Sequence, residues 1–384
     1  MKSNRLISIS LMVLSGVSLS SANLHAVEPA SINLGPVDFI PVVQVLNGYD
    51  DNFRANSDKE GTWFTSIQPS FTLGTAGLKS EYEITYSFIH DYYHSYSSEK
   101  TTDHFIDAAA YFEFNSRNRL LLSADIADTS DINGKDEPND EFRTSGLNAL
   151  YTFGAQTARV NIDLGFDLGR TRTQNDINED KDLNARLLSS TVYYRVSPRT
   201  RLLGEVRHSK QDYTINNALD STNQSYLLGA QWEATAFTTG SLRIGRTDKD
   251  FKDPARDDVS RNMWELGLVW EPLTYSRFNA QTRSSIEEGD EGATSINQQR
   301  HQVGWNHEWN GFISSTLTYS YTTRDYKNDQ NRKDKIHNSS IGVNYAVDRW
   351  IDLGLRYQYI DNNSNIATED YNRNQIMLTL TVSL

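Results

Sequence analysis

Residues 376–384 read IMLTLTVSL, a run in which apolar side chains alternate with Met377 and with three small polar residues, Thr379, Thr381 and Ser383. In an extended chain the apolar members fall on one face: Ile376, Leu378, Leu380, Val382 and Leu384. An amphipathic strand at the end of the chain is typical of outer-membrane β-barrels, although their usual last residue is Phe. The alternative is the final strand of a soluble β domain.

The same alternation recurs in residues 159–169, 263–271, 302–309 and 350–359. In the first of these, the even positions from Val160 to Leu168 are apolar, and the odd positions are Arg, Asn, Asp or Gly. These runs are about ten residues long, which is the length a tilted strand needs to cross a bilayer. Trp and Tyr stand near their ends, as in the aromatic belts of membrane proteins.

Two kinds of connection separate the strands. Long polar segments occupy 50–61, 129–141, 173–182, 247–260, 286–297 and 324–335, whereas short turns occupy 74–77, 115–118, 197–200, 271–274 and 348–349. Aromatic residues stand beside successive short turns, about forty residues apart: Phe114, Phe153, Tyr194, Phe237, Trp270, Trp309 and Trp350. One hairpin per repeat fits a barrel with long external loops and short periplasmic turns. A β-propeller is the alternative, but it needs four short strands per repeat.

We therefore predict an all-β fold: a closed antiparallel transmembrane β-barrel of the outer membrane, with about 18 strands (16–18). A barrel of that size encloses an aqueous channel. The strands should begin near Phe39, Trp63, Leu78, Asp103, Arg119, Glu141, Thr157, Asp182, Thr200, Thr222, Thr239, Val259, Ser276, Gln298, Phe312, Lys335, Trp350 and Tyr371.

The ends and the composition agree with an exported protein. Residues 1–26 have the charged start, the apolar stretch and the small-residue cleavage site of a secretory signal peptide. Residues 27–38 then form a short periplasmic segment and 39–384 the barrel. There are no cysteines, and the net charge of −13 argues against a nucleic-acid partner. No stretch is apolar enough for a transmembrane helix.

Charged residues on the face opposite the apolar one are candidates for the pore lumen: Asp107, Glu113, Asp163, Asp167, Arg201, Glu205, Arg207, Arg243, Glu265, Arg277, Arg283, Glu308, Arg324 and Arg356. Glu83 and Asp125 belong to the same face. Such residues can line a path for a hydrated solute, or they can pair across strands and hold the wall together. Tyr82, Tyr86, Tyr111 and Tyr193 are candidate platforms for sugars, or else membrane-facing residues.

No arrangement of residues points to an enzyme, a cofactor or a metal. The chain has no Gly-x-Ser-x-Gly element, and the acidic runs at 287–291 and 178–182 lack the spacing of an EF-hand. We interpret those runs as solvated external loops.

Residues 41–54 read PVVQVLNGYDDNFR. This Pro-led strand and its Tyr-Asp-Asp-Asn-Phe-Arg corner resemble the start of the putative β-barrel porin 2 family, whose members are often encoded in exopolysaccharide loci. The resemblance implies an outer-membrane channel that exports an exopolysaccharide passively, with a periplasmic export protein and the outer-membrane lipids as partners. Two alternatives stay open: a general or sugar-selective diffusion porin, and a structural or adhesive barrel whose loops bind a partner.

Overall fold

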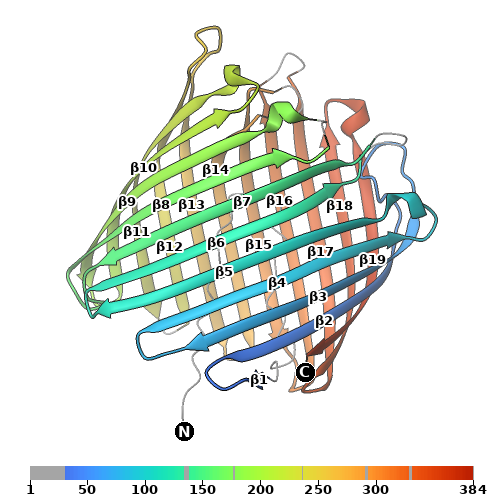
Figure 1. Cartoon of the computed structure of the whole chain (residues 1–384), viewed down its shortest axis with the longest axis horizontal. Helices are drawn as coiled ribbons and strands as arrows, with labels where there is room; N and C mark the ends of the chain where they lie inside the picture. Colours follow the sequence, from blue (N-terminus) through green and yellow to red (C-terminus); the bar gives the residue numbers. More distant parts are fainter. Residues whose placement is uncertain are drawn as a thin grey trace.

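The structure is a computed structural model that describes residues 31–133, 138–175, 178–235, 237–289, 293–327 and 331–383. The predicted signal peptide and Leu384 lie outside the described residues. Figure 1 shows a single wall of tilted strands that curves round into a barrel, with β4–β8 in front and β14–β18 behind. Among the described residues, no helix is long and apolar enough to cross a membrane.

Eighteen strands build the wall. They are β2 (Asp38–Asp50), β3 (Thr62–Ala76), β4 (Ser80–Tyr93), β5 (Thr101–Asn115), β6 (Asn118–Asp131), β7 (Asp140–Phe153), β8 (Val160–Thr173), β9 (Leu183–Ser197), β10 (Thr200–Tyr213), β11 (Ser221–Thr235), β12 (Thr238–Phe251), β13 (Val259–Leu273), β14 (Ser276–Glu288), β15 (Ser295–Glu308), β16 (Ile313–Tyr326), β17 (Lys333–Asp348), β18 (Ile351–Ser364) and β19 (Tyr371–Ser383). A two-residue strand, β1 (Ile32–Asn33), pairs with the start of β2. The described part of the longer loops contains four single-turn 3-10 helices: Ser97–Glu99, Glu179–Lys181, Asn217–Leu219 and Ala367–Glu369.

Every strand of the wall is antiparallel to both neighbours, and β19 pairs with β2. In this closing pair Val382 lies opposite Val43 and Leu378 lies opposite Asn47. Closure leaves no free edge, so every backbone polar group in the wall can be paired without water. The predicted fold and strand number are confirmed, and each predicted strand start lies within a few residues of the observed one.

The strands are longer, and the loops shorter, than the sequence predicts. The segment expected as a loop over 247–260 is strand up to Phe251 and again from Val259. The segment expected over 286–297 is likewise strand at both ends. Above the membrane both faces of a strand meet water, so the apolar alternation disappears while the hydrogen-bonded ladder continues. Polar composition alone therefore misplaces the end of a strand.

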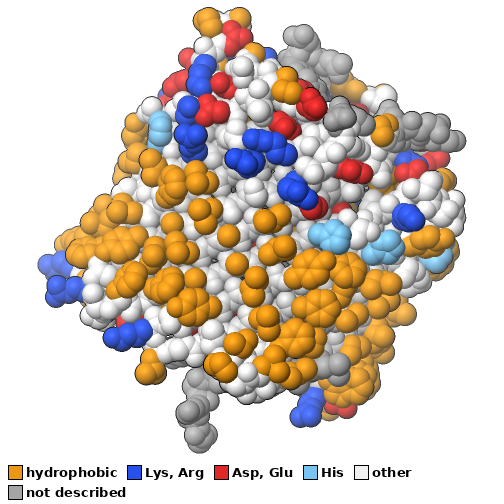
Figure 2. Space-filling view, in the orientation of Figure 1, with side chains coloured by type: hydrophobic (Ala, Val, Ile, Leu, Met, Phe, Trp, Pro, Cys, Tyr) orange, Lys and Arg blue, Asp and Glu red, His pale blue; other side chains and the backbone are white. Residues whose placement is uncertain are grey.

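The outer surface carries a continuous apolar band. Figure 2 shows hydrophobic side chains covering the middle and lower wall, with most of the charged side chains above them. Leu164, Leu202, Leu228 and Leu378 are among the exposed aliphatic residues of this band. All seven aromatic residues predicted beside the short turns are exposed at its lower edge: Phe114, Phe153, Tyr194, Phe237, Trp270, Trp309 and Trp350. The predicted aromatic girdle is thus present at the end of the barrel that carries the short turns.

Candidate functional site: the lumen wall

Residues directly opposite each other on adjacent strands share a face, so the exposed apolar band determines which side chains point inward. By this criterion all predicted lumen residues lie on the inner face: Asp107, Glu113, Asp163, Asp167, Arg201, Glu205, Arg207, Arg243, Glu265, Arg277, Arg283, Glu308, Arg324 and Arg356. The four tyrosines predicted as candidate sugar platforms lie on two different faces of the wall. Tyr82 and Tyr86 are exposed on the outer band, whereas Tyr111 and Tyr193 point inward.

Four of these residues form one ion network across β10, β12 and β13. Glu205 accepts a hydrogen bond from Nε of Arg207 at 2.6 Å and another from Nε of Arg243 at 2.8 Å. Nη1 of Arg207 reaches further, to Glu265 at 2.8 Å. Glu205 is only 7% exposed. These four charges therefore pair with one another. In this part of the lumen wall, charged side chains pair across strands and hold the wall together, which was the alternative to lining a solute path.

Two glycines give this network its room. Gly229 of β11 lies opposite Arg243, and Gly245 of β12 lies between Leu227 and Met263 on the neighbouring strands. Neither position has a side chain, so the long arginine side chains can lie along the wall and cross the strands between their partners. A Cβ at Gly245 would lie 1.9 Å from a backbone oxygen, so no other residue fits there without a shift of the wall.

The neighbouring part of the lumen wall, on β4–β8, carries carboxylates without partners among the described residues. Asp107 and Asp125 are directly opposed on β5 and β6. Glu83, Asp163 and Asp167 extend this acidic stripe over β4–β8. Among the described residues, none of the five has a side-chain hydrogen bond or an ion pair. Like charges directly opposite destabilise a sheet, so packing and stability alone do not account for the stripe.

Arginines face the acidic stripe from the far wall. Arg283 of β14 lies directly opposite Arg300 of β15, and Arg356 projects from β18. Arg300 and Arg324 bond to neutral glutamine side chains, at 3.2 Å and 3.1 Å. Figure 1 places β4–β8 in the front wall and β14–β18 in the back wall, so the acidic stripe and these arginines lie on opposite sides of the lumen. Arg300 was not among the predicted lumen residues. It stands two positions before Gln302 on the same strand, so both side chains lie on the inner face.

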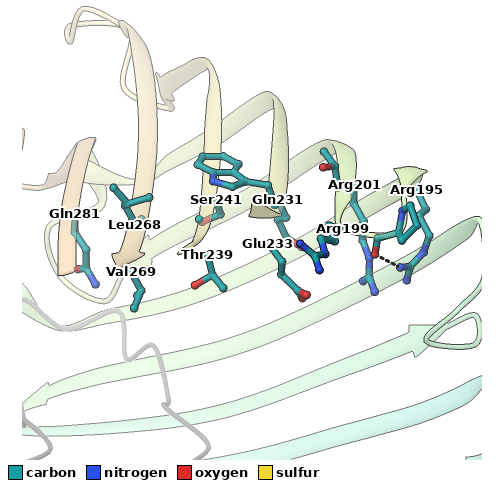
Figure 3. A pocket seen from close by; sticks show the side chains of 15 residues that line it. Arg195, Arg199, Arg201, Gln231, Glu233, Thr239, Ser241, Leu268, Val269 and Gln281 are labelled. Atoms are coloured by element: carbon teal, nitrogen blue, oxygen red, sulfur yellow. Dashed lines mark hydrogen bonds between the residues drawn. The ribbon is translucent and has the colours of Figure 1, made fainter. Parts of the chain in front are cut away.

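A pocket of about 440 Å³ lies on the inner wall near the short turns of β9–β14. Figure 3 shows Arg195, Arg199 and Arg201 at one side of it, with Glu233 as the nearby carboxylate. Arg195 donates a hydrogen bond to the backbone oxygen of Pro198 at 3.1 Å, and Arg201 donates one to that of Gln156 at 3.3 Å. The pocket is an open recess of the mouth at the short-turn end, with a positive side and no catalytic pair among its lining residues.

The corner at residues 49–54 fastens the seam between the first and last strands. Asp50 is 1% exposed and accepts a hydrogen bond from Nε of Arg373 at 2.8 Å. The side-chain amide of Asn52 donates to the backbone oxygen of Asn372 at 3.0 Å. Arg54 ties the same loop to Glu60 and Glu99. Asp50, Asn52 and Arg54 of this corner thus each have a specific partner, and these contacts explain the motif structurally.

Comparison with known proteins agrees with this architecture. The family model described as "Putative beta-barrel porin 2" matches residues 25–384. No curated protein sequence matches the chain significantly.

Several solved structures of bacterial proteins resemble the chain. The outer membrane protein OpdK of Pseudomonas aeruginosa shares 10% identity, with 90% of this chain and 99% of that chain covered and a TM-score of 0.49. OprD of the same organism shares 10% identity, with 90% and 95% covered and a TM-score of 0.47. The FrpB iron transporter of Neisseria meningitidis shares 11% identity, with 90% and 81% covered and a TM-score of 0.50. At these identities the likeness concerns the fold alone.

The family match spans the whole barrel, and the fold, its closure and the apolar band agree with it. The chain is a porin-type outer-membrane β-barrel and belongs to the Putative beta-barrel porin 2 family.

Proposed function

We propose that this barrel is a passive diffusion channel for small hydrophilic solutes, with a preference for cations. The observation that carries the proposal is the stripe of unpaired carboxylates on β4–β8, which faces arginines on β14–β18. A wall of fixed negative charge raises the local concentration of cations, and acidic rings select cations in many channels. The opposed arginines add a field that orients dipolar solutes during passage.

The export of an exopolysaccharide was the expectation from the family resemblance. The family match does not support it. Only two of the four candidate sugar platforms, Tyr111 and Tyr193, point inward. The diffusion channel, which was the alternative, accounts better for the charged wall. A structural or adhesive barrel would not need unpaired carboxylates inside.

Recordings in planar bilayers test the proposal. The purified protein should form open channels, and a salt gradient should give a reversal potential of the sign expected for cations. The double variant Asp107→Asn/Asp125→Asn should reduce that selectivity. Asp58→Asn removes one negative charge from the exposed first loop, outside the lumen, and should change the selectivity less. A protein that folds and inserts but never conducts would contradict the proposal.

Deletion of the gene separates diffusion from export. The diffusion channel predicts slower uptake of small cationic or dipolar solutes and normal polysaccharide at the cell surface. Loss of surface polysaccharide with unchanged uptake would overturn the proposal in favour of export.

A further inference from the structure

A group of cations lies on the outer surface of the barrel, just above the apolar band. On β8 the outward residue above Leu168 is Arg170, and on β9 the outward residue above Leu188 is Arg186. Lys210 of β10 lies directly opposite Arg186. These side chains share the face of the apolar band, so they point toward the surrounding membrane and not into the lumen. Figure 2 shows Lys and Arg side chains gathered above the band on this side of the barrel.

The group includes two pairs of like charge. Arg186 faces Lys210, and Arg143 of β7 faces Arg172 of β8. Direct opposition of like charges destabilises a sheet. On β14–β17 the outer face carries hydroxyl–imidazole pairs that bond each other. Tyr319 bonds His337 at 2.8 Å, and Thr282 bonds His301 at 2.8 Å. Any of these cations that has no partner within the protein therefore needs an explanation that barrel stability does not provide.

Three of the cations have partners within the protein. Arg143 donates two hydrogen bonds to Asp128, at 2.6 Å and 2.8 Å. Arg172 donates to the side chain of Asn184 at 2.7 Å, and Lys210 pairs with Asp212 at 2.8 Å.

Arg170 and Arg186 differ from these three. Both are exposed, and neither makes a side-chain hydrogen bond or ion pair with another residue of the part that the structure describes. They project from adjacent strands, because Arg186 lies opposite Leu168, two residues before Arg170. Their side chains can therefore converge on one ligand between the strands.

We propose that Arg170 and Arg186, with Lys210 beside them, bind the phosphate group of a phosphorylated glycolipid in the outer leaflet. A guanidinium group matches a phosphate through two parallel hydrogen bonds. Leu168 and Leu188, directly below, offer an apolar surface to the acyl chains of the same lipid. The ligand is a lipid because these side chains lie at the boundary between apolar band and polar wall, where the surrounding phase is membrane. The long loops identify this as the external end of the barrel.

The test uses the full-length mature protein in vesicles of neutral phosphatidylcholine, with or without bis-phosphorylated lipid A. Bound lipid is counted by native mass spectrometry, and thermal unfolding is followed in parallel. We expect lipid A to bind and to raise the unfolding temperature. Dephosphorylated lipid A should bind at least about tenfold more weakly, since the charge-assisted hydrogen bonds are lost.

The double variant Arg170→Gln/Arg186→Gln should lose this binding to a similar extent. Arg246→Gln is a control for the loss of one outward arginine, because Arg246 is exposed and already paired with Asp248 at 2.8 Å. The heat-dependent shift of the folded band on gels checks that each variant folds. Unchanged binding by the folded double variant, equal binding of the dephosphorylated lipid, or equal protection by inorganic phosphate alone would overturn the proposal.

Discussion

Asp50, in the first strand of the barrel, accepts a hydrogen bond from Nε of Arg373 in the last strand at 2.8 Å. The same carboxylate accepts a further bond from the side-chain amide of Gln375 at 2.8 Å. The two strands are separated by almost the whole chain, so this contact forms only when the barrel closes. Asp50 is 1% exposed, which makes the contact a buried charge pair at the seam.

Asp50→Ala should destabilise the barrel. Removal of one partner from a buried pair costs about 3–5 kcal/mol, but the Arg373 side chain remains 21% exposed. We therefore expect about 2–4 kcal/mol, measured by unfolding in denaturant. Lys59→Ala removes an exposed pair with Asp51 in the same loop and should cost about 0–1 kcal/mol. Equal losses in the two variants would show that the seam does not depend on Asp50.

Acid should loosen the same seam at Asp51. Burial raises the pKa of Asp51, but hydrogen bonds from Asn374 and Lys59 outweigh that effect and leave the pKa lowered. A carboxyl with a lowered folded-state pKa contributes stability above its unfolded pKa of about 4, and the contribution disappears as the pH falls through the lower folded value. Hydrogen exchange at the Asn374 amide should therefore accelerate below about pH 4 relative to intrinsic exchange, and much less so in Asp51→Asn. A pH-independent protection factor would contradict this assignment.

An arginine substitution on the outer band should lower the free energy of unfolding, and one on the lumen face should not. Leu164→Arg and Leu266→Arg place a charge in lipid and should cost about 2–4 kcal/mol. Gly267→Arg is the matched lumen variant, because a Cβ there has its nearest neighbour at 3.6 Å. Gly165→Arg should also avoid the lipid penalty, but its Cβ would require the Ser189 hydroxyl at 2.3 Å to rotate away. A similar loss of unfolding free energy in all four variants would show that the faces are wrongly assigned.

Neutralising the acidic stripe should leave the barrel as stable or more stable. Asp107→Asn/Asp125→Asn removes two opposed negative charges, and relief of such a pair is worth about 0.2–1 kcal/mol. The same variant is expected to lose cation selectivity, so stability and function should change in opposite directions. A clear loss of stability would mean that the carboxylates have structural partners, which would remove the argument for a functional stripe.

The mature chain should be found in the outer membrane as a heat-modifiable barrel that begins after Ala26. The basis is the predicted signal peptide together with the closed apolar band. Membrane fractionation and N-terminal sequencing of the purified protein measure both properties. Recovery of a soluble periplasmic protein would contradict the location.

The sequence by itself determined the membrane barrel, its strand number and the orientation of most side chains. Alternation has a period of two, so runs such as 159–169 and 376–384 show which residues face lipid. The aromatic residues beside the short turns show where each hairpin meets the membrane boundary. Both are local properties of single strands. A shift of a strand by one residue would turn all its apolar side chains to the lumen, so the alternation assigns the two faces unambiguously.

Only the tertiary structure decided which lumen charges are paired. Arg207 and Glu265 lie on strands that are not neighbours, and their contact depends on the register of the strands between them and on the space at Gly245. The same register leaves Asp107 facing Asp125 and leaves Arg170 and Arg186 without a protein partner. Pairing between strands follows from accumulated register and barrel closure, and alternation within one strand carries no information about either.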